Sequence, residues 1–230
     1  MGYSSSRARP RRCPSVAERR GLLLDWGGVM TTNLMASFSA FCSAEGLDPN
    51  ALAGAFRSNP EAREVLFAFE EGRMEETEFE MRLAELLGVA AAEGLIDRLF
   101  SGSLLEREMV EAVRAARRGG VRTGLISNSW GTTRYPHDLL AELFEGVVLS
   151  GDVGLRKPAP RIYELGAEAI ALPPERCVFV DDLPFNLPPA QELGMATVHH
   201  KSPAETIPRL EELLGLVLRE QGSGTAAARP

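Results

Sequence analysis

The chain contains two patterns of hydrophobic and polar residues, which meet near Gly119. Over residues 34–118 apolar side chains recur every three to four positions, which predicts helices throughout this block. After Gly119 short apolar runs alternate with helical segments, which predicts strands and helices in turn. One further apolar run, residues 22–24, precedes the helical block and predicts a short strand buried on both faces.

Glycine, proline and asparagine residues mark the ends of the predicted elements. In the helical block they separate segments at 34–46, 49–57, 60–71, 75–87, 91–100 and 104–118. Beyond it, the predicted strands are 121–126, 147–149, 177–180 and 195–199, and the predicted helices are 138–144, 161–171, 188–193 and 204–214.

Strands that alternate with helices are typical of a parallel sheet built from βαβ units. We therefore expect an α/β fold: a Rossmann-like open parallel sheet, with an all-helical cap domain inserted after the first strand. The expected core is residues 21–30 and 112–218, and the expected cap is residues 31–111. The Arg- and Ser-rich residues 1–20 predict a disordered arm, and the Gly- and Ala-rich residues 219–230 predict a flexible tail.

Charge and cysteine usage narrow the choice of partners. The net charge is −7, but the first 20 residues carry six Arg and one Glu, so the remainder has a net charge of −12. The negative charge of residues 21–230 argues against general nucleic-acid binding. An anionic ligand therefore has to be bound by a few local cations. No apolar stretch approaches the roughly 18 residues of a membrane helix, so we expect no membrane partner. Three cysteines without metal-ligand spacing favour a reducing, cytoplasmic setting.

Four polar motifs end or follow the predicted strands. Because open parallel sheets bind their ligands at the carboxyl edge of the strands, we expect these motifs to meet there. The motifs are Asp25-Trp-Gly-Gly-Val, Ser127-Asn128-Ser129, Lys157 within Gly-Leu-Arg-Lys-Pro, and the pair Asp181-Asp182.

In this order the four motifs resemble those of the haloacid dehalogenase superfamily, which are a nucleophilic Asp, a Ser or Thr, a Lys and an acidic pair. Residues 150–163 and 180–186 look most like the branch that contains the N-terminal phosphatase domain of soluble epoxide hydrolases. The resemblance covers about residues 21–215.

The resemblance implies a Mg²⁺-dependent phosphohydrolase or phosphotransferase that acts on a small phosphorylated metabolite through an aspartyl-phosphate. Asp25 would be the nucleophile and Lys157 would neutralise the phosphoryl oxygens. Ser127, with the backbone at Asn128, would hydrogen-bond the transferring group. Arg73, in a predicted break between cap helices, is the expected substrate contact from the cap.

Magnesium prefers hard oxygen ligands, and two adjacent carboxylates repel one another unless a cation relieves them. The expected ligands are the carboxylates of Asp25 and Asp182 and the backbone carbonyl of Gly27, with Asp181 as a further ligand. The ion would screen the negative charge of the phosphate from the attacking carboxylate.

Gly27 departs from the family pattern. The family's phosphatases carry a second Asp at this position, which protonates the leaving alcohol, and glycine has no proton to give. General acid catalysis contributes about 10²–10⁴-fold, so we expect poor turnover of alkyl phosphates and a preference for leaving groups of low pKa.

The departure at Gly27 leaves other functions open. The main alternative is a catalytically impaired family member that serves as a binding or regulatory protein. A metal-free dehalogenase is a further alternative, since halide needs no proton, but the pair Asp181-Asp182 argues against it. Phosphonatases use a cap lysine, and residues 31–118 contain none.

Overall fold

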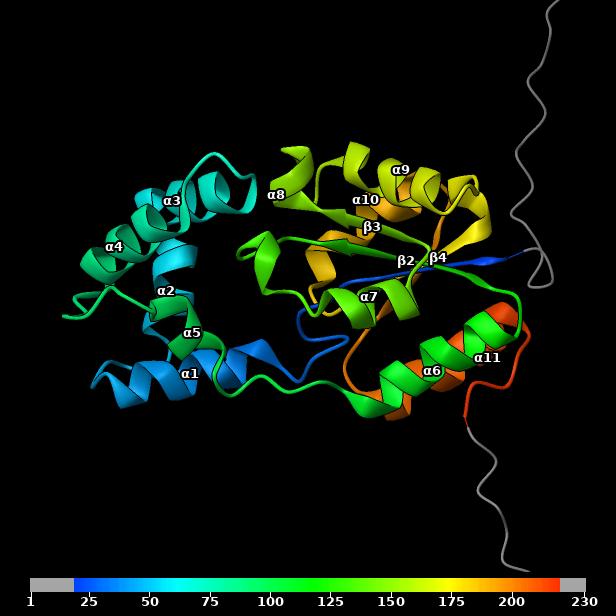
Figure 1. The fold of residues 1–230 in the computed structure, drawn as a ribbon, viewed down its shortest axis with the longest axis horizontal. Helices are drawn as coiled ribbons and strands as arrows, with labels where there is room; N and C mark the ends of the chain where they lie inside the picture. The colour runs from blue at the N-terminus through cyan, green and yellow to red at the C-terminus, as the bar shows by residue number, and fades with distance from the viewer. Residues whose placement is uncertain (1–18, 220–230) are drawn as a thin grey trace, which may run out of the picture.

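The computed structural model describes residues 19–219 as an α/β core and an all-helical insertion (Figure 1). The predictions for the N-terminal arm and the C-terminal tail fall almost wholly on residues 1–18 and 220–230, outside the described residues. Arg20, at the end of the predicted arm, is joined to the sheet: its backbone N–H donates to the carbonyl of Arg176, and its carbonyl accepts from the N–H of Arg122.

Five parallel strands form the sheet, in the order β3-β2-β1-β4-β5. The first strand therefore lies at the centre. Leu24 pairs with Leu125 of β2 and Val180 of β4, so the three central strands end at nearly the same level. The strands are β1 (Gly21–Leu24), β2 (Arg122–Ser127), β3 (Gly146–Leu149), β4 (Cys177–Asp181) and β5 (Ala196–His199).

Helices cover both faces of this sheet, which confirms the predicted fold class (Figure 1). Leu22 and Leu24 belong to the apolar cluster on one face, and Leu23 to the cluster on the other. Successive strand residues point to opposite faces, so a continuous apolar run suits a strand buried on both sides. The first face is covered by α6 (Arg107–Arg118), α7 (His137–Leu143) and α11 (Pro203–Leu214), and the second by α9 (Pro160–Ala169) and α10 (Leu187–Glu192).

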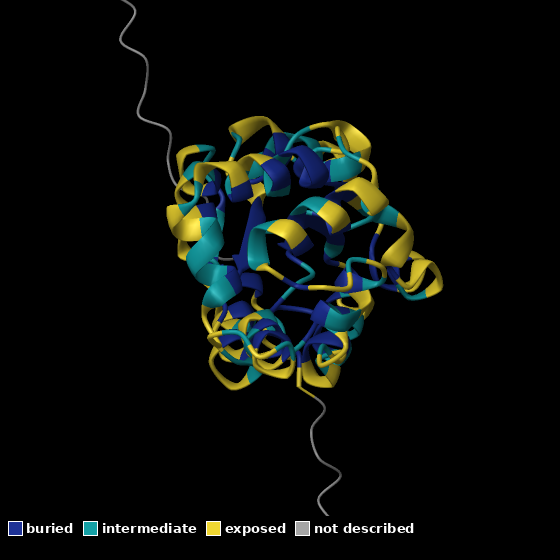
Figure 2. Ribbon diagram, turned by 90° about the vertical axis from the view of Figure 1, so that its left-hand side faces the viewer, coloured by how far each residue is buried: buried dark blue, intermediate teal, exposed yellow. Residues whose placement is uncertain are grey.

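Five helices between β1 and β2 enclose an apolar core of their own, and we call them the helical insertion. Phe69 and Phe79 stack within it, with ring centroids 4.1 Å apart. Figure 2 shows buried segments inside the molecule and exposed segments on its outer helices. The insertion consists of α1 (Leu34–Ala44), α2 (Ala51–Ser58), α3 (Pro60–Glu70), α4 (Glu76–Leu87) and α5 (Leu95–Phe100).

Helix α3 connects the insertion to the core. Asn59 caps its start by accepting a hydrogen bond from the N–H of Glu61 at 2.9 Å, and Pro60 occupies the first turn. The chain then turns at Gly72, whose φ is +69° and whose Cβ would lie 2.3 Å from the carbonyl oxygen of Gly151. Only glycine fits this approach to α8 (Ser150–Val153), a one-turn helix that the sequence pattern did not predict.

The two segments that join the insertion to the core run side by side. Thr31 and Leu105 form an isolated antiparallel bridge, and the N–H of Thr32 donates to the carbonyl of Leu104 at 2.8 Å. The N–H of Glu106 donates in turn to the carbonyl of Met30 at 2.9 Å. The insertion thus leaves and rejoins the core at one place, close to Asp25.

Helix α6 packs on the sheet, and the predicted boundary at residue 111 falls inside this helix. Met109 and Val113 are fully buried in the apolar cluster on the sheet, not in the cluster of the insertion. The change from insertion to core therefore falls between α5 and α6. Within residues 19–219, no helix is both long enough and apolar enough to cross a membrane.

Candidate active site

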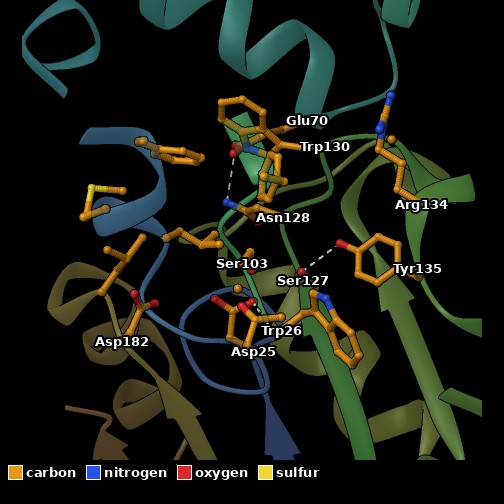
Figure 3. A pocket seen from close by; sticks show the side chains of 18 of the residues that line it. Asp25, Trp26, Glu70, Ser103, Ser127, Asn128, Trp130, Arg134, Tyr135 and Asp182 are labelled. Carbon is orange, nitrogen blue, oxygen red and sulfur yellow. Dashed lines mark hydrogen bonds between the residues drawn. The ribbon is translucent and has the colours of Figure 1, made fainter. Parts of the chain in front are cut away.

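The four polar motifs meet at the carboxyl edge of the sheet. Asp25 follows β1, Ser127 ends β2 and Asp181 ends β4. Lys157 comes from the loop between α8 and α9 and reaches two of these side chains. Figure 3 shows Asp25, Ser127 and Asp182 near the ends of the strands, below the helical insertion.

Lys157 lies between two carboxylates. Its Nζ is 2.8 Å from Oδ1 of Asp25 and 2.7 Å from Oδ2 of Asp181, and the residue is 1% exposed. Burial lowers the pKa of Lys157, but Asp181 and Asp25 together outweigh burial and hold that pKa above its usual value. An ammonium group has three N–H donors, so one remains for an anionic ligand after these two contacts.

Asp181 orients this lysine. The residue is fully buried, and its Oδ1 accepts hydrogen bonds from the N–H of Leu183 and the side-chain amide of Asn186, both at 2.9 Å. Its Oδ2 accepts the hydrogen bond from Lys157. Because both oxygens have donors, Asp181 acts here as a support for Lys157, and its additional role as a metal ligand stays a prediction.

Three carboxylates form a compact acidic cluster. Asp25, Asp181 and Asp182 each place an oxygen within 4.8 Å of the others. Burial raises the pKa of Asp25 to about 7, and burial followed by repulsion from Asp181 raises the pKa of Asp182 to about 6. The cluster therefore resists full ionisation, and a cation among its oxygens would relieve the repulsion. Hard oxygen donors at this spacing fit Mg²⁺.

The Gly27-Gly28 turn brings the backbone against this cluster. Gly28 has a φ of +74°, and a Cβ there would lie 2.4 Å from Oδ2 of Asp182, so a side chain at this position would displace the carboxylate. Gly27 lines the cavity beside Asp25, where its carbonyl is predicted to be a metal ligand. With no side chain, it presents no proton donor to that space.

Tyr135 orients Ser127. The phenol donates a hydrogen bond to Oγ of Ser127 at 2.9 Å, and both side chains are buried. Burial raises the pKa of Tyr135, so the phenol keeps its proton. Because Ser127 accepts from Tyr135, its own hydroxyl proton can be donated to a ligand above the sheet edge.

Asn128 clamps the backbone of Lys157. Its Oδ1 accepts from the N–H of Lys157 at 2.8 Å, and its Nδ2 donates to the carbonyl of the same residue at 3.1 Å. The sequence predicts Asn128 as a substrate contact. The structure adds that the side chain fixes the loop that carries Lys157.

Glu70, at the end of α3, joins the insertion to this loop. Its Oε2 accepts from Nε of Arg156 at 2.6 Å, and the guanidinium of Arg156 lies 3.8 Å from the ring centroid of Phe67. Burial raises the pKa of Glu70, opposed by the charge of Arg156. The carboxylate also accepts a hydrogen bond from the side-chain amide of Asn128 at 3.4 Å. The insertion is therefore held against the loop that positions Lys157.

Arg73 is not brought to the site. It is absent from the cavity lining, and its guanidinium pairs with Glu71 at 2.8 Å and with Glu64 at 3.8 Å on the surface. The break between cap helices that contains it faces α8 through Gly72 instead. A contact between Arg73 and the substrate stays a prediction.

A cavity of about 670 Å³ opens above Asp25, between the sheet edge and the insertion. Asp25, Ser127, Lys157 and Asp182 supply polar groups on the sheet side, and Trp130 lies toward the insertion (Figure 3). Most of the remaining lining is apolar. We call this apolar part of the cavity, away from the sheet edge, the chamber. A charged group bound at Asp25 would thus lie beside it.

Sequence reasoning missed the residues that support the site from other elements. Tyr135 and Trp130 follow Ser127 closely in the chain, but nothing in their spacing indicates contact with a hydroxyl or a place in the cavity lining. Glu70 offered a signal, since it follows Leu66 by four residues and so shares its apolar helix face. A carboxylate on such a face is costly to bury without a partner.

Comparisons with known proteins agree with this geometry. The protein-family model described as a haloacid dehalogenase-like hydrolase matches residues 20–194. Bifunctional epoxide hydrolase 2 of Rattus norvegicus is 30% identical over 131 residues, which cover 52% of this chain and 24% of that protein. The chain thus matches about a quarter of the length of such relatives.

A further relative and a solved structure each match most of the chain. Hexitol phosphatase A of Escherichia coli is 26% identical over 217 residues, which cover 92% of this chain and 95% of that protein. A magnesium complex of a HAD family enzyme from Bacteroides thetaiotaomicron shares the fold, with a TM-score of 0.58, 22% identity, and coverage of 80% of this chain and 94% of that one. Since the family model matches well over half of the sequence, the protein belongs to the haloacid dehalogenase-like hydrolases.

Proposed function

We propose that the protein is a Mg²⁺-dependent phosphohydrolase or phosphotransferase that acts on a small phosphorylated molecule through an aspartyl-phosphate at Asp25. The observation that carries this proposal is the buried Lys157 between Asp25 and Asp181, at the polar side of the cavity. The similarity to hexitol phosphatase A over most of the chain supports phosphatase chemistry.

Asp25 supplies the nucleophile. Its Oδ1 accepts from Lys157 and from the N–H of Trp26 at 2.7 Å, which leaves Oδ2 for the attack on phosphorus. A bond forms between this oxygen and phosphorus as the bond to the leaving oxygen breaks, and the leaving oxygen takes the electron pair. Water then attacks phosphorus and releases inorganic phosphate, which restores the carboxylate. An alcohol in place of water gives phosphoryl transfer.

Lys157 and Ser127 hold the transferring group. The third N–H of the Lys157 ammonium and the hydroxyl proton of Ser127 can both be donated to phosphoryl oxygens. Tyr135 and Asn128 fix these two donors in advance, so little reorganisation accompanies the reaction. The backbone at Asn128 is the proposed further donor.

Asp25, Asp182 and the carbonyl of Gly27 are the proposed holders of Mg²⁺, with Asp181 as a further candidate. Bound there, the ion would neutralise charge on the phosphoryl group. The close approach of the three carboxylates supports this assignment, because a cation among their oxygens would relieve their mutual repulsion.

Replacement of Asp182 tests the metal site. Asp182→Asn removes an anionic ligand but keeps the shape of the side chain, so Mg²⁺ affinity measured by calorimetry should fall by about 100-fold or more. Asp138→Asn, an exposed aspartate at the start of α7, is the matched control and should bind as the wild type does. Unchanged affinity in Asp182→Asn would show that the ion binds elsewhere.

A second candidate function rests on Gly27. Because the position that carries the acid in the family's phosphatases has no side chain here, a binding or regulatory protein that retains the fold without turnover is the competing proposal. Turnover separates the two, whereas binding of Mg²⁺ or of a phosphate analogue does not. Complete absence of turnover with every phosphate tested, together with intact Mg²⁺ binding, would favour the binding protein.

A further inference from the structure

The cavity above Asp25 is much larger than a phosphoryl group requires. Its volume of about 670 Å³ falls within the range of about 300–1,000 Å³ that is usual for sites enclosing drug-sized ligands. Away from the sheet edge its lining is dominated by aromatic and aliphatic side chains, which include Leu34, Phe38, Phe56, Leu66, Phe100 and Trp130. The group attached to the phosphate therefore meets an apolar surface.

Exposed apolar side chains gather at this cavity. Among residues 19–219, eight large apolar side chains are more than a third exposed. Four of the eight line the cavity, although water is an unfavourable neighbour for them. They are Met35, Leu104, Leu105 and Phe185. An apolar ligand bound in the cavity would cover these side chains, which explains why they are exposed without it.

The cations of the lining are already paired. Arg134 is bonded to Glu76 and Asp97, and Arg156 to Glu70. The third cation in the described lining, Lys157, lies between its two aspartates. A second anionic group on the substrate would find no unpaired cation in the lining, and its burial there would be costly.

Trp130 makes the chamber aromatic. It follows Ser127 by three residues, so one loop carries both a proposed phosphoryl donor and an aromatic wall. Its ring centroid lies 5.5 Å from that of Phe38, 5.4 Å from that of Phe100 and 6.1 Å from that of Phe56. Aromatic rings favour such edge and stacked contacts with a further ring.

We infer that the substrate is a phosphomonoester of an uncharged phenol, an aryl phosphate whose ring occupies this chamber. The inference rests on the proposed function and narrows it. Gly27 favours a leaving oxygen that departs as a stabilised anion, which both acyl and aryl phosphates offer. The aromatic lining, whose cations are already paired, selects the aryl phosphate, because a small acyl group would leave the apolar part of the cavity unfilled.

Three phosphates test the inference with the full-length protein and Mg²⁺. 4-Methylphenyl phosphate and O-phosphotyrosine share a phenolic leaving group, but only the second carries an ammonium and a carboxylate. We expect kcat/KM for 4-methylphenyl phosphate to exceed that for O-phosphotyrosine by about tenfold or more. Acetyl phosphate should show the highest KM of the three. Equal or better turnover of O-phosphotyrosine overturns the inference and leaves the proposed phosphatase activity standing.

A matched pair of variants tests whether the apolar lining of the cavity causes the preference for an aryl phosphate. Met35 and Met81 are both on insertion helices and are 48% and 58% exposed, but only Met35 lines the cavity. Met35→Gln should raise the KM for 4-methylphenyl phosphate about three- to tenfold. The same substitution should raise the KM for acetyl phosphate by a smaller factor. Met81→Gln should change neither value. Equal effects of the two substitutions would contradict an apolar ligand in this chamber.

Measurements of ligand binding test the aromatic cavity independently of phosphatase activity. In calorimetry with Mg²⁺ present, benzylphosphonate, which cannot be hydrolysed, should bind about tenfold or more tightly than methylphosphonate. That preference without turnover of any phosphate would support the aromatic chamber and count against the phosphatase. Equal affinity for the two phosphonates would overturn the chamber even in an active enzyme.

Discussion

Asp25→Asn is expected to lower kcat for 4-nitrophenyl phosphate by roughly 10⁴-fold or more, because an amide oxygen is a poor nucleophile toward phosphorus. The variant should stay folded. Asparagine keeps the shape of the aspartate side chain, and Lys157 keeps its contact with Asp181. Initial rates with Mg²⁺, together with thermal unfolding, measure both effects.

Removal of Lys157 is a less informative experiment. Loss of one partner of a buried ion pair typically costs about 3–5 kcal/mol, so Lys157→Met would mix unfolding with lost catalysis. Asp138→Asn is again the matched control for Asp25→Asn, since it makes the same chemical change at an exposed position. A folded Asp25→Asn protein with wild-type kcat would contradict the assignment of the nucleophile.

Gly27→Asp is expected to speed up alkyl phosphates selectively, because it supplies the acid that the chain lacks. The substrates should share an apolar ring, so that binding does not confound the comparison: 2-phenylethyl phosphate releases an alkoxide and 4-nitrophenyl phosphate a stabilised phenolate. In the wild type the first should be far slower than the second. In Gly27→Asp its kcat should rise by about 10²–10⁴-fold, whereas the phenolic ester should change little.

The new side chain at Gly27 requires space. A Cβ there would lie 2.6 Å from Cδ1 of Leu34, the end of a flexible side chain, so a rotation of Leu34 can accept it. The double variant Gly27→Asp/Leu34→Ala provides the space directly, and Leu34→Ala alone is its control. Equal rates for the two esters in the wild type would show that another group already acts as the acid.

The meeting of the four motifs at one sheet edge could be predicted from the sequence because it depends on a single rule. Parallel strands end at one edge, so Asp25, Ser127 and Asp181 were expected together once the strands were found. Helix bounds also agreed closely, as at α3, where the predicted 60–71 compares with Pro60–Glu70. Asn59 and Pro60 mark the start of that helix locally, so no knowledge of distant contacts was needed.

The sequence is less informative where the answer depends on which surfaces meet. The period of residues 104–118 indicates an apolar face but not the residue at which the chain passes from the insertion to the sheet, and the boundary predicted at residue 111 falls inside α6. Arg73 was expected at the site because it lies in a loop, and the structure shows it paired with Glu64 and Glu71 on the surface.

The cavity could not be predicted at all. Its apolar lining comes from segments distant in the chain, such as Met35, Leu104 and Phe185, each of which looks like an ordinary surface residue by itself. Their common role follows only from the packing of the insertion over the sheet edge.

The covalent intermediate is the most direct test of the proposed reaction. With Mg²⁺ and 4-nitrophenyl phosphate in excess, samples are quenched in acid within the first turnovers, digested, and examined by mass spectrometry. We predict one added phosphoryl group on the peptide that contains Asp25, with the modification on Asp25 itself, and none in the Asp25→Asn protein. Turnover without any phosphorylated peptide, or with the phosphoryl group on another residue, would contradict the account.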